Sequence, residues 1–192
     1  MQVQTHWLGG LAAGLAVAAF VSLHPLALIG VSTLAGPLPD LDHPGSRYGR
    51  WLPLPGVMQA QGAVVPYRPG VPTAGRVGRW TPLGILWHRG PTHSLAAVLG
   101  WALAGALLGW FGWHQAAWAL TLALGLGAGT FSHLVLDALN GMGEAWLWPL
   151  RSRRYGLPWP RLRVGSFGEG LVTAGLVLAV VALGHAWVGR RF

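Results

Sequence analysis

Cysteine is absent from this 192-residue sequence, and acidic residues are scarce, with only five aspartates and glutamates in all. The lack of cysteine excludes disulfide bonds and thiolate-bound zinc, so any metal must be held by histidine and carboxylate. It also means that thiol content cannot indicate the cellular compartment. Charged residues make up 9% of the chain, whereas a typical soluble domain has about 25%. The composition therefore excludes an ordinary soluble domain.

Apolar sequence takes the place of the missing charges. Hydrophobic residues are 53% of the chain, and its mean hydropathy is +0.47. Asp, Glu, Lys and Arg are absent from residues 1–39, 94–136 and 170–189, and about 20 apolar residues suffice to cross a bilayer. The run 8–23 has no Lys or Arg before it, unlike a signal peptide, so we expect it to be retained as a span. The sequence predicts an all-α integral membrane protein.

Helical segments follow from these apolar runs and from the turn residues between them. The expected segments are residues 6–23, 26–37, 93–110, 116–140 and 168–188. The second is too short to span a bilayer alone, so we expect about four to five transmembrane segments. We interpret residues 1–192 as one domain. Its Pro- and Gly-rich loop, 44–86, acts either as a lid over a site or only as a spacer.

The distribution of arginine predicts the orientation. Tracing the segments back and forth brings most acidic residues and histidines to one side of the membrane, and eleven of the thirteen arginines lie on that side, in the loops 47–89 and 151–163. By the positive-inside rule this side is cytoplasmic, in a multi-pass protein of the inner membrane. Because these arginines lie between apolar stretches, where a membrane protein has its cytoplasmic loops, no nucleic-acid partner is expected. The oligomeric state is left open.

Two motifs place carboxylates beside imidazoles. Asp40, Asp42 and His43 lie within four residues of irregular backbone, an arrangement that can bridge two metal ions. His133 and Asp137 are four residues apart on a predicted helix, so both project from one face and can bind one ion. For the first motif the alternative is a solvated turn with aspartate caps. For His133 and Asp137 the alternative is a spacing that arose by chance. Together the two motifs predict a metal site on one side of the membrane.

A third motif reads His-Arg-Gly-Pro-Thr-His-Ser. The turn formed by its glycine and proline allows His88 and His93 to reach the same site, while Thr92 or Ser94 caps the helix that follows. The alternative is a pair of interfacial histidines. Arg89 is suited to hold a phosphate oxygen through its planar, always charged guanidinium, or else it anchors the chain at the membrane surface.

Two further residues are predicted ligands by their position. His6 heads an apolar helix on the same side of the membrane, where an interfacial histidine is the alternative, and Glu169 stands alone near the start of the last segment. The complete set of predicted metal ligands is His6, Asp40, Asp42, His43, His88, His93, His133, Asp137 and Glu169.

Taken in order, these motifs resemble those of the YdjM-like family, LexA-regulated, membrane-bound metal-dependent hydrolases of bacterial inner membranes. The matching stretches are residues 5–6, 39–43, 88–94, 132–137 and 148–149. The long Pro- and Gly-rich loop departs from the family pattern. The family in turn distantly resembles zinc phospholipase C and P1-type nucleases, all-helical phosphoesterases with clustered His and Asp ligands. The resemblance implies a hydrolase without naming its substrate.

We therefore expect a membrane-bound hydrolase with two or three divalent ions, most simply zinc, with manganese or iron accepted by the same ligands. Asp42 or Asp40 would bridge the ions, and a metal-activated water would attack a phosphoester of a lipid or amphiphilic substrate at the cytoplasmic face. Asp42 and Arg89 are the predicted catalytic residues. A divalent-metal transporter is one alternative, although it should carry ligands along a path through the midplane. A non-catalytic membrane scaffold, which needs no metal, is the other.

The absence of native cysteine makes the predicted orientation testable. Ser46→Cys and Ser152→Cys should be protected from an impermeant thiol reagent added outside intact cells, because both lie in the arginine-rich loops. Gly189→Cys, at the opposite end of the last segment, should be labelled. Labelling of Ser46→Cys from outside would contradict the cytoplasmic assignment.

Overall fold

The computed structural model describes residues 1–21, 23–43, 46–48, 89–140, 143–151, 153–157 and 161–190. These residues form five α-helices and two short 3-10 helices, and they contain no strand. The α-helices are α1 (Val3–Ala18), α2 (Pro25–Ala35), α5 (Leu95–Trp113), α6 (Ala116–Ala138) and α7 (Phe167–Gly189), and the 3-10 helices are η1 (Leu38–Asp42) and η4 (Pro91–His93). The all-α prediction is confirmed.

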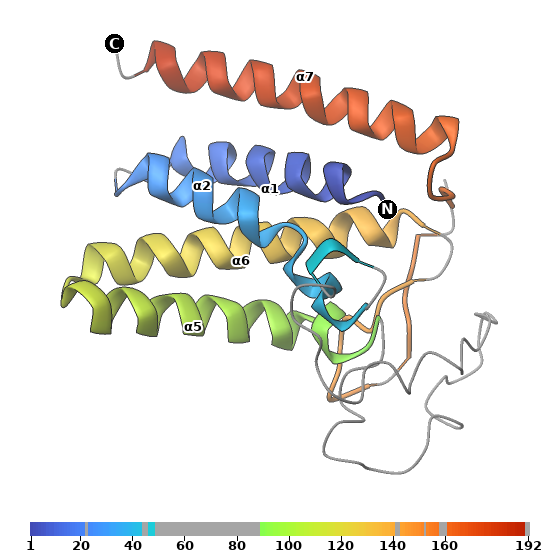
Figure 1. Ribbon diagram of the computed structural model, residues 1–192, viewed down its shortest axis with the longest axis horizontal. Helices are drawn as coiled ribbons and strands as arrows, with labels where there is room; N and C mark the ends of the chain where they lie inside the picture. Colours follow the sequence, from blue (N-terminus) through green and yellow to red (C-terminus); the bar gives the residue numbers. More distant parts are fainter. Residues whose placement is uncertain are drawn as a thin grey trace.

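The five helices lie side by side, with α6 at the centre of the packing (Figure 1). Helix α6 contacts α1, α2 and α5, whereas α7 packs against α1. The chain reverses direction between consecutive helices, so one end of the bundle gathers the start of α1, the ends of α2 and α6, and the starts of α5 and α7. The short helices η1 and η4 lie at the same end. Segments that are distant in sequence therefore meet there.

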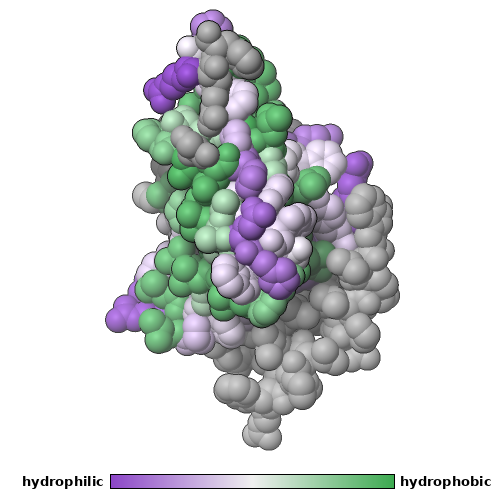
Figure 2. Space-filling view, turned by 90° about the vertical axis from the view of Figure 1, so that its left-hand side faces the viewer, coloured by the Kyte–Doolittle hydropathy of each residue, from purple (hydrophilic) through white to green (hydrophobic). Residues whose placement is uncertain are grey.

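Three of the helices are long and apolar enough to cross a membrane, counting the described residues only: α5, α6 and α7. Large apolar side chains such as Leu99 and Leu178 lie exposed on them, each 70% accessible, which suits contact with lipid. Figure 2 views the end of the bundle that lies on the left in Figure 1, and shows apolar residues flanking the hydrophilic ones. A helical membrane protein is thus confirmed, while the number of crossings stays a prediction.

The short helices α1 and α2, of 16 and 11 residues, are held against α6 by close backbone contact. A Cβ atom at Gly10 or at Gly129 would collide with the carbonyl oxygen of Ser32. The Ser32 hydroxyl also donates a hydrogen bond of 2.8 Å to the Gly10 carbonyl oxygen. Glycine thus lets three backbones meet at one level of the bundle.

The helix boundaries differ most from prediction at the end of the first segment. Helix α1 ends at Ala18 rather than at Leu23, because the backbone turns there to reach Pro25, which begins α2 with its fixed φ. The predicted lid or spacer, 44–86, lies outside the described residues except for 46–48.

Candidate metal centre

Six of the predicted ligands come together at the end of the bundle where the N-terminus lies (Figure 1). They come from four segments of the chain, namely the first turn of α1, η1, η4 and the last turns of α6. The six are His6, Asp40, Asp42, His93, His133 and Asp137. All except Asp40 are buried, in keeping with a site built into the bundle rather than a solvated turn.

These residues form three groups of three, in each of which one ligand atom per residue lies within 4.8 Å of the others. The groups are His6, Asp40 and His133; His93, His133 and Asp137; and Asp40, Asp42 and His93. Because the groups share members, the cluster has room for adjacent cations with common ligands. Imidazole nitrogen and carboxylate oxygen are ligands that zinc, manganese and iron accept.

His133 is oriented by the backbone of α2. Its Nδ1 lies 2.9 Å from the carbonyl oxygen of Gly36, and since a carbonyl only accepts, Nδ1 carries the proton. The Nε2 atom is then left to face the cluster, 3.2 Å from Nε2 of His93 and 3.7 Å from Oδ2 of Asp137. A backbone hydrogen bond that fixes the far nitrogen of an imidazole is typical of metal-ligating histidines.

His6 supplies the strongest sign that a cation belongs here. Its ring stacks on that of His133 with centroids 3.8 Å apart. It is fully buried, and neither ring nitrogen has a hydrogen-bond partner among the described residues. The nearest carboxylate oxygen, Oδ1 of Asp137, is 3.4 Å away from its Nε2. A buried polar atom without a partner costs about 1–3 kcal/mol, and a cation bound to Nε2 would remove this cost. The residues therefore fit a divalent metal.

Thr92 connects the second aspartate to the second histidine. Its hydroxyl donates to Oδ2 of Asp42 and lies 2.9 Å from Nδ1 of His93. Asp42 Oδ2 is itself 3.4 Å from that Nδ1. Ser94, not Thr92, caps α5, because its Oγ accepts a hydrogen bond from the Ala97 amide at 3.1 Å. The two hydroxyls of the motif therefore have different roles. That of Thr92 orients Asp42 and His93, and that of Ser94 caps α5.

The charge state of His93 is set by its neighbours. Burial alone would lower the pKa of His93, but the negative charges of Asp42 and Glu144 and hydrogen bonds to Asp40 and Asp42 hold it well above its usual value. The imidazole is thus protonated at neutral pH in the metal-free protein. A metal that binds its ring must first displace this proton.

Arg89 is buried, whereas a phosphate clamp or a surface anchor was predicted from the sequence. The residue is 4% exposed and adopts a left-handed backbone conformation with φ of 61°, a strained state that is common at functional sites. Its guanidinium lies 2.6 Å from Oδ2 of Asp137 and 2.6 Å from Oε1 of Glu144, and donates to Oδ1 of Asn140 at 2.8 Å. Arg89 is therefore no surface anchor. Its contacts hold Asp137 in place, and its role as a phosphate clamp stays a prediction.

Glu144 is a member of the site that the sequence motifs missed. It is fully buried, and burial raises its pKa to about 7, although His93 and Arg89 oppose this shift. Its backbone pairs with that of Tyr155 through hydrogen bonds of 2.9 and 2.8 Å, which fixes the loop beneath Arg89. No histidine stands beside Glu144 in the sequence, so spacing gave no signal. The scarcity of acidic residues was the available clue.

The remaining predicted ligands lie apart from the cluster or outside the described residues. Glu169 accepts hydrogen bonds from the amides of Gln2 and Gly165 at 2.5 and 2.6 Å and from the Thr5 hydroxyl at 3.2 Å. This carboxylate ties α7 to the start of α1, and the structure does not bring it to the metal ligands. His43 is likewise in none of the three groups. His88 lies outside the described residues.

The fold and the cluster define a helical membrane protein with a candidate metal centre at one end. The model of the YdjM inner membrane protein family matches residues 1–192, so the chain belongs to this family, as its motifs predicted. Bacillus subtilis YvsG is 28% identical over 179 residues, which cover 93% of this chain and 91% of the relative. The inner membrane protein YbcI of Escherichia coli is 31% identical over 108 residues, 54% of this chain and 60% of that protein. No solved structure matches the chain, and the more distant likeness to zinc phospholipase C and P1-type nucleases is not shown.

Glu144 should matter for metal affinity although it is not among the ligands. A cation bound to Asp137 would lie close to the positively charged Arg89 guanidinium. The Glu144 carboxylate contacts this guanidinium and would offset the repulsion between the two positive charges. Loss of an outer partner of this kind typically weakens metal binding by about 10–100-fold. We expect Glu144→Gln to do so, measured by titrating zinc into purified protein with helical content monitored. Glu169→Gln is the matched control, since it removes a buried carboxylate outside the cluster. Equal affinity of Glu144→Gln and the wild type would contradict this role.

The raised pKa of His93 predicts how metal stabilisation depends on pH. In the metal-free protein the charged imidazole stabilises the fold below its unfolded pKa, and this contribution is lost as pH rises through the folded pKa. Metal binding has the opposite dependence, because it requires the neutral ring. The shift in unfolding temperature on adding zinc should therefore grow from about pH 6 to about pH 8. A shift that shrinks over this range would be inconsistent with His93 as a ligand.

Proposed function

We propose that the chain is a membrane-bound metal-dependent hydrolase that cleaves a phosphoester of a lipid or other amphiphilic substrate at the cytoplasmic face. The observation that carries the proposal is the buried convergence of six histidine and aspartate side chains at one end of the helices. Within it, His6 lacks any hydrogen-bond partner among the described residues.

Burial of so many carboxylates favours a metal site over a scaffold. Asp42 and Asp137 are each 1% exposed, and a buried charge is strongly unfavourable unless opposite charge compensates it. The Met1 amino group, 3.0 Å from Oδ1 of Asp137, and Arg89 offset part of this cost. Asp42 lies against His93 and the Thr92 hydroxyl, and Asp40 lies 3.7 Å from both His93 and His133. A non-catalytic scaffold does not require buried carboxylates at this position, whereas bound divalent cations would compensate their negative charge.

The location of the ligands favours an enzyme over a transporter. His133 and Asp137 lie in the last two turns of α6, and the preceding turns of this helix carry no charged side chain. A transporter is expected to hold its cargo near the membrane midplane. Ligands gathered at one helix end suit a site that acts on groups at the membrane surface, where lipid headgroups lie.

The chain's own residues would prepare the site for hydrolysis. A divalent cation supplies a Lewis acid for a phosphoryl oxygen and lowers the pKa of a water molecule to near neutrality. Arg89 holds Asp137 through Oδ2, while Oδ1 faces the Met1 amino group and His6. Thr92 holds Asp42 against His93. Asp40 is the most exposed of the clustered ligands, with 17% of its side chain accessible. A substrate would therefore approach over η1, on the side of Asp40.

Metal analysis and a substrate panel test the proposal. Asp137→Asn, His93→Ala and Asp42→Asn should each lose at least one equivalent of bound metal with helical content retained, because each removes a ligand from a shared group. His185→Ala, which changes an exposed histidine of α7, is the control and should keep its metal. Wild-type protein should hydrolyse a phosphoester, lose this activity with a chelator, and recover it with zinc or manganese. Folded, metal-loaded protein that is inactive on phosphate and acyl esters would refute the enzyme proposal.

A further inference from the structure

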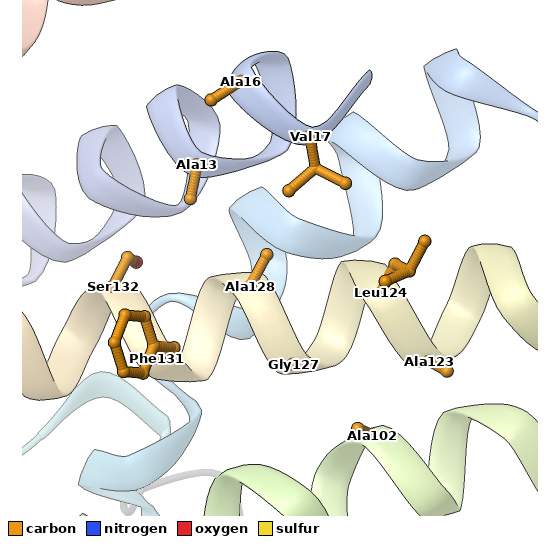
Figure 3. A pocket seen from close by; sticks show the side chains of 10 residues that line it. All are labelled: Ala13, Ala16, Val17, Ala102, Ala123, Leu124, Gly127, Ala128, Phe131 and Ser132. Atoms are coloured by element: carbon orange, nitrogen blue, oxygen red, sulfur yellow. The ribbon is translucent and has the colours of Figure 1, made fainter. Parts of the chain in front are cut away.

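A hollow of about 490 Å³ lies along the side of the bundle, between α1, α5 and α6 (Figure 3). Helix α6 forms its floor with Leu124 and Ala128, α1 forms one wall with Ala13 and Val17, and Ala102 of α5 lies on the other side. The hollow exists because these side chains are mostly small. Two of the helices that line it, α5 and α6, are long and apolar enough to cross a membrane, so we expect the hollow to face the hydrocarbon of the bilayer.

The chemistry of the lining selects an apolar occupant. Among the lining residues the one polar side chain is Ser132, and its hydroxyl donates a hydrogen bond of 2.7 Å to the Gly129 carbonyl oxygen. The lining thus presents no unpaired donor to a ligand. A helix from another chain is a poor fit, since an α-helix is about 10–12 Å wide and the hollow would hold only about one turn of it. A narrow hydrocarbon chain fits this space without that penalty.

The hollow leads toward the metal centre. Its lining includes Phe131 and Ser132, which directly precede the ligand His133 on α6. The Phe131 ring meets that of Trp146 edge to face, with centroids 6.3 Å apart. Trp146 Nε1 donates to the Tyr155 carbonyl oxygen. An indole packed on an apolar ring and bonded to a polar loop is typical of the membrane interface, where the ester groups of a lipid lie.

We propose that this hollow holds one acyl chain of a membrane lipid and so directs the ester and phosphate of that lipid to the end of the bundle that carries the metal ligands. The binding of the chain is independent of any reaction. The consequence for substrate choice, a lipid bearing at least one long acyl chain, rests on the proposed hydrolase function.

Two matched glycine substitutions test the proposal. Gly127 lines the hollow, and a Cβ there would lie 3.4 Å from the Ala102 Cβ, so Gly127→Leu would fill the space at ordinary contact distance. Gly100, on α5, has no atom within 4 Å of an added Cβ, so Gly100→Leu adds the same side chain to an open surface. The probe is a phosphatidylglycerol with a diazirine at the end of one acyl chain. It is incorporated with the full-length protein into phosphatidylethanolamine and phosphatidylglycerol vesicles.

Light should attach the probe to peptides of α1 and α6 in the wild type and in Gly100→Leu. In Gly127→Leu we expect roughly tenfold less labelling of these peptides, the effect of keeping about two methylenes out of an apolar site. Equal labelling of the two variants would overturn the proposal. It would also be overturned if Gly127→Leu changed the oligomeric state while lipid labelling stayed the same, because the hollow would then be a contact between copies.

A second measurement separates this proposal from the hydrolase function. In the metal-loaded protein, Gly127→Leu should lose turnover of a long-chain phospholipid about tenfold while it keeps that of a short, water-soluble phosphodiester. Specific labelling without hydrolysis of either substrate would refute the enzyme and leave the acyl site standing. Hydrolysis of both substrates at wild-type rates by Gly127→Leu would refute the acyl site and leave the enzyme standing.

Discussion

A carboxylate near the end of an apolar helix is unfavourable unless opposite charge surrounds it, and Asp137 is in this position with 1% of its surface exposed. Its two oxygens meet the Met1 amino group, His6 and Arg89 at distances of 3.0, 3.4 and 2.6 Å. Two of these contacts come from the start of the chain and one from the turn before η4. The start of α1, the turn before η4 and the end of α6 are therefore fixed relative to one another by the need to compensate one charge.

Helix packing and the candidate site depend on the same close approaches. A Cβ at Gly36 would collide with the carbonyl oxygen of His6, and the Gly36 carbonyl in turn orients His133. The two imidazoles stack because α1 and α6 both lie close to the end of α2. The small residues that permit tight packing in lipid thus also set the spacing of the ligands.

The helices and most of the cluster could be predicted from the sequence because they depend on residues that are close together along the chain. Apolar runs predict spans, and His133 and Asp137 share a helix face whatever the tertiary structure. The sequence did not predict Glu144, which reaches Arg89 through a loop paired with Tyr155, nor that Arg89 would be buried. Nor did it predict the partners of Glu169, because a lone acidic residue gave no sign that backbone amides from Gln2 and Gly165 would donate hydrogen bonds to it. Spacing along the chain cannot reveal partners supplied by distant loops.

The Glu169 contacts also give the outermost helix a mechanical link to the interior. No residue in the apolar window of α7 is buried within the protein, although the helix packs against α1. Its Glu169 carboxylate accepts hydrogen bonds from the Gln2 amide and from the hydroxyl of Thr5, which directly precedes His6. Through these two hydrogen bonds the outermost helix is joined to the backbone segment that leads into His6.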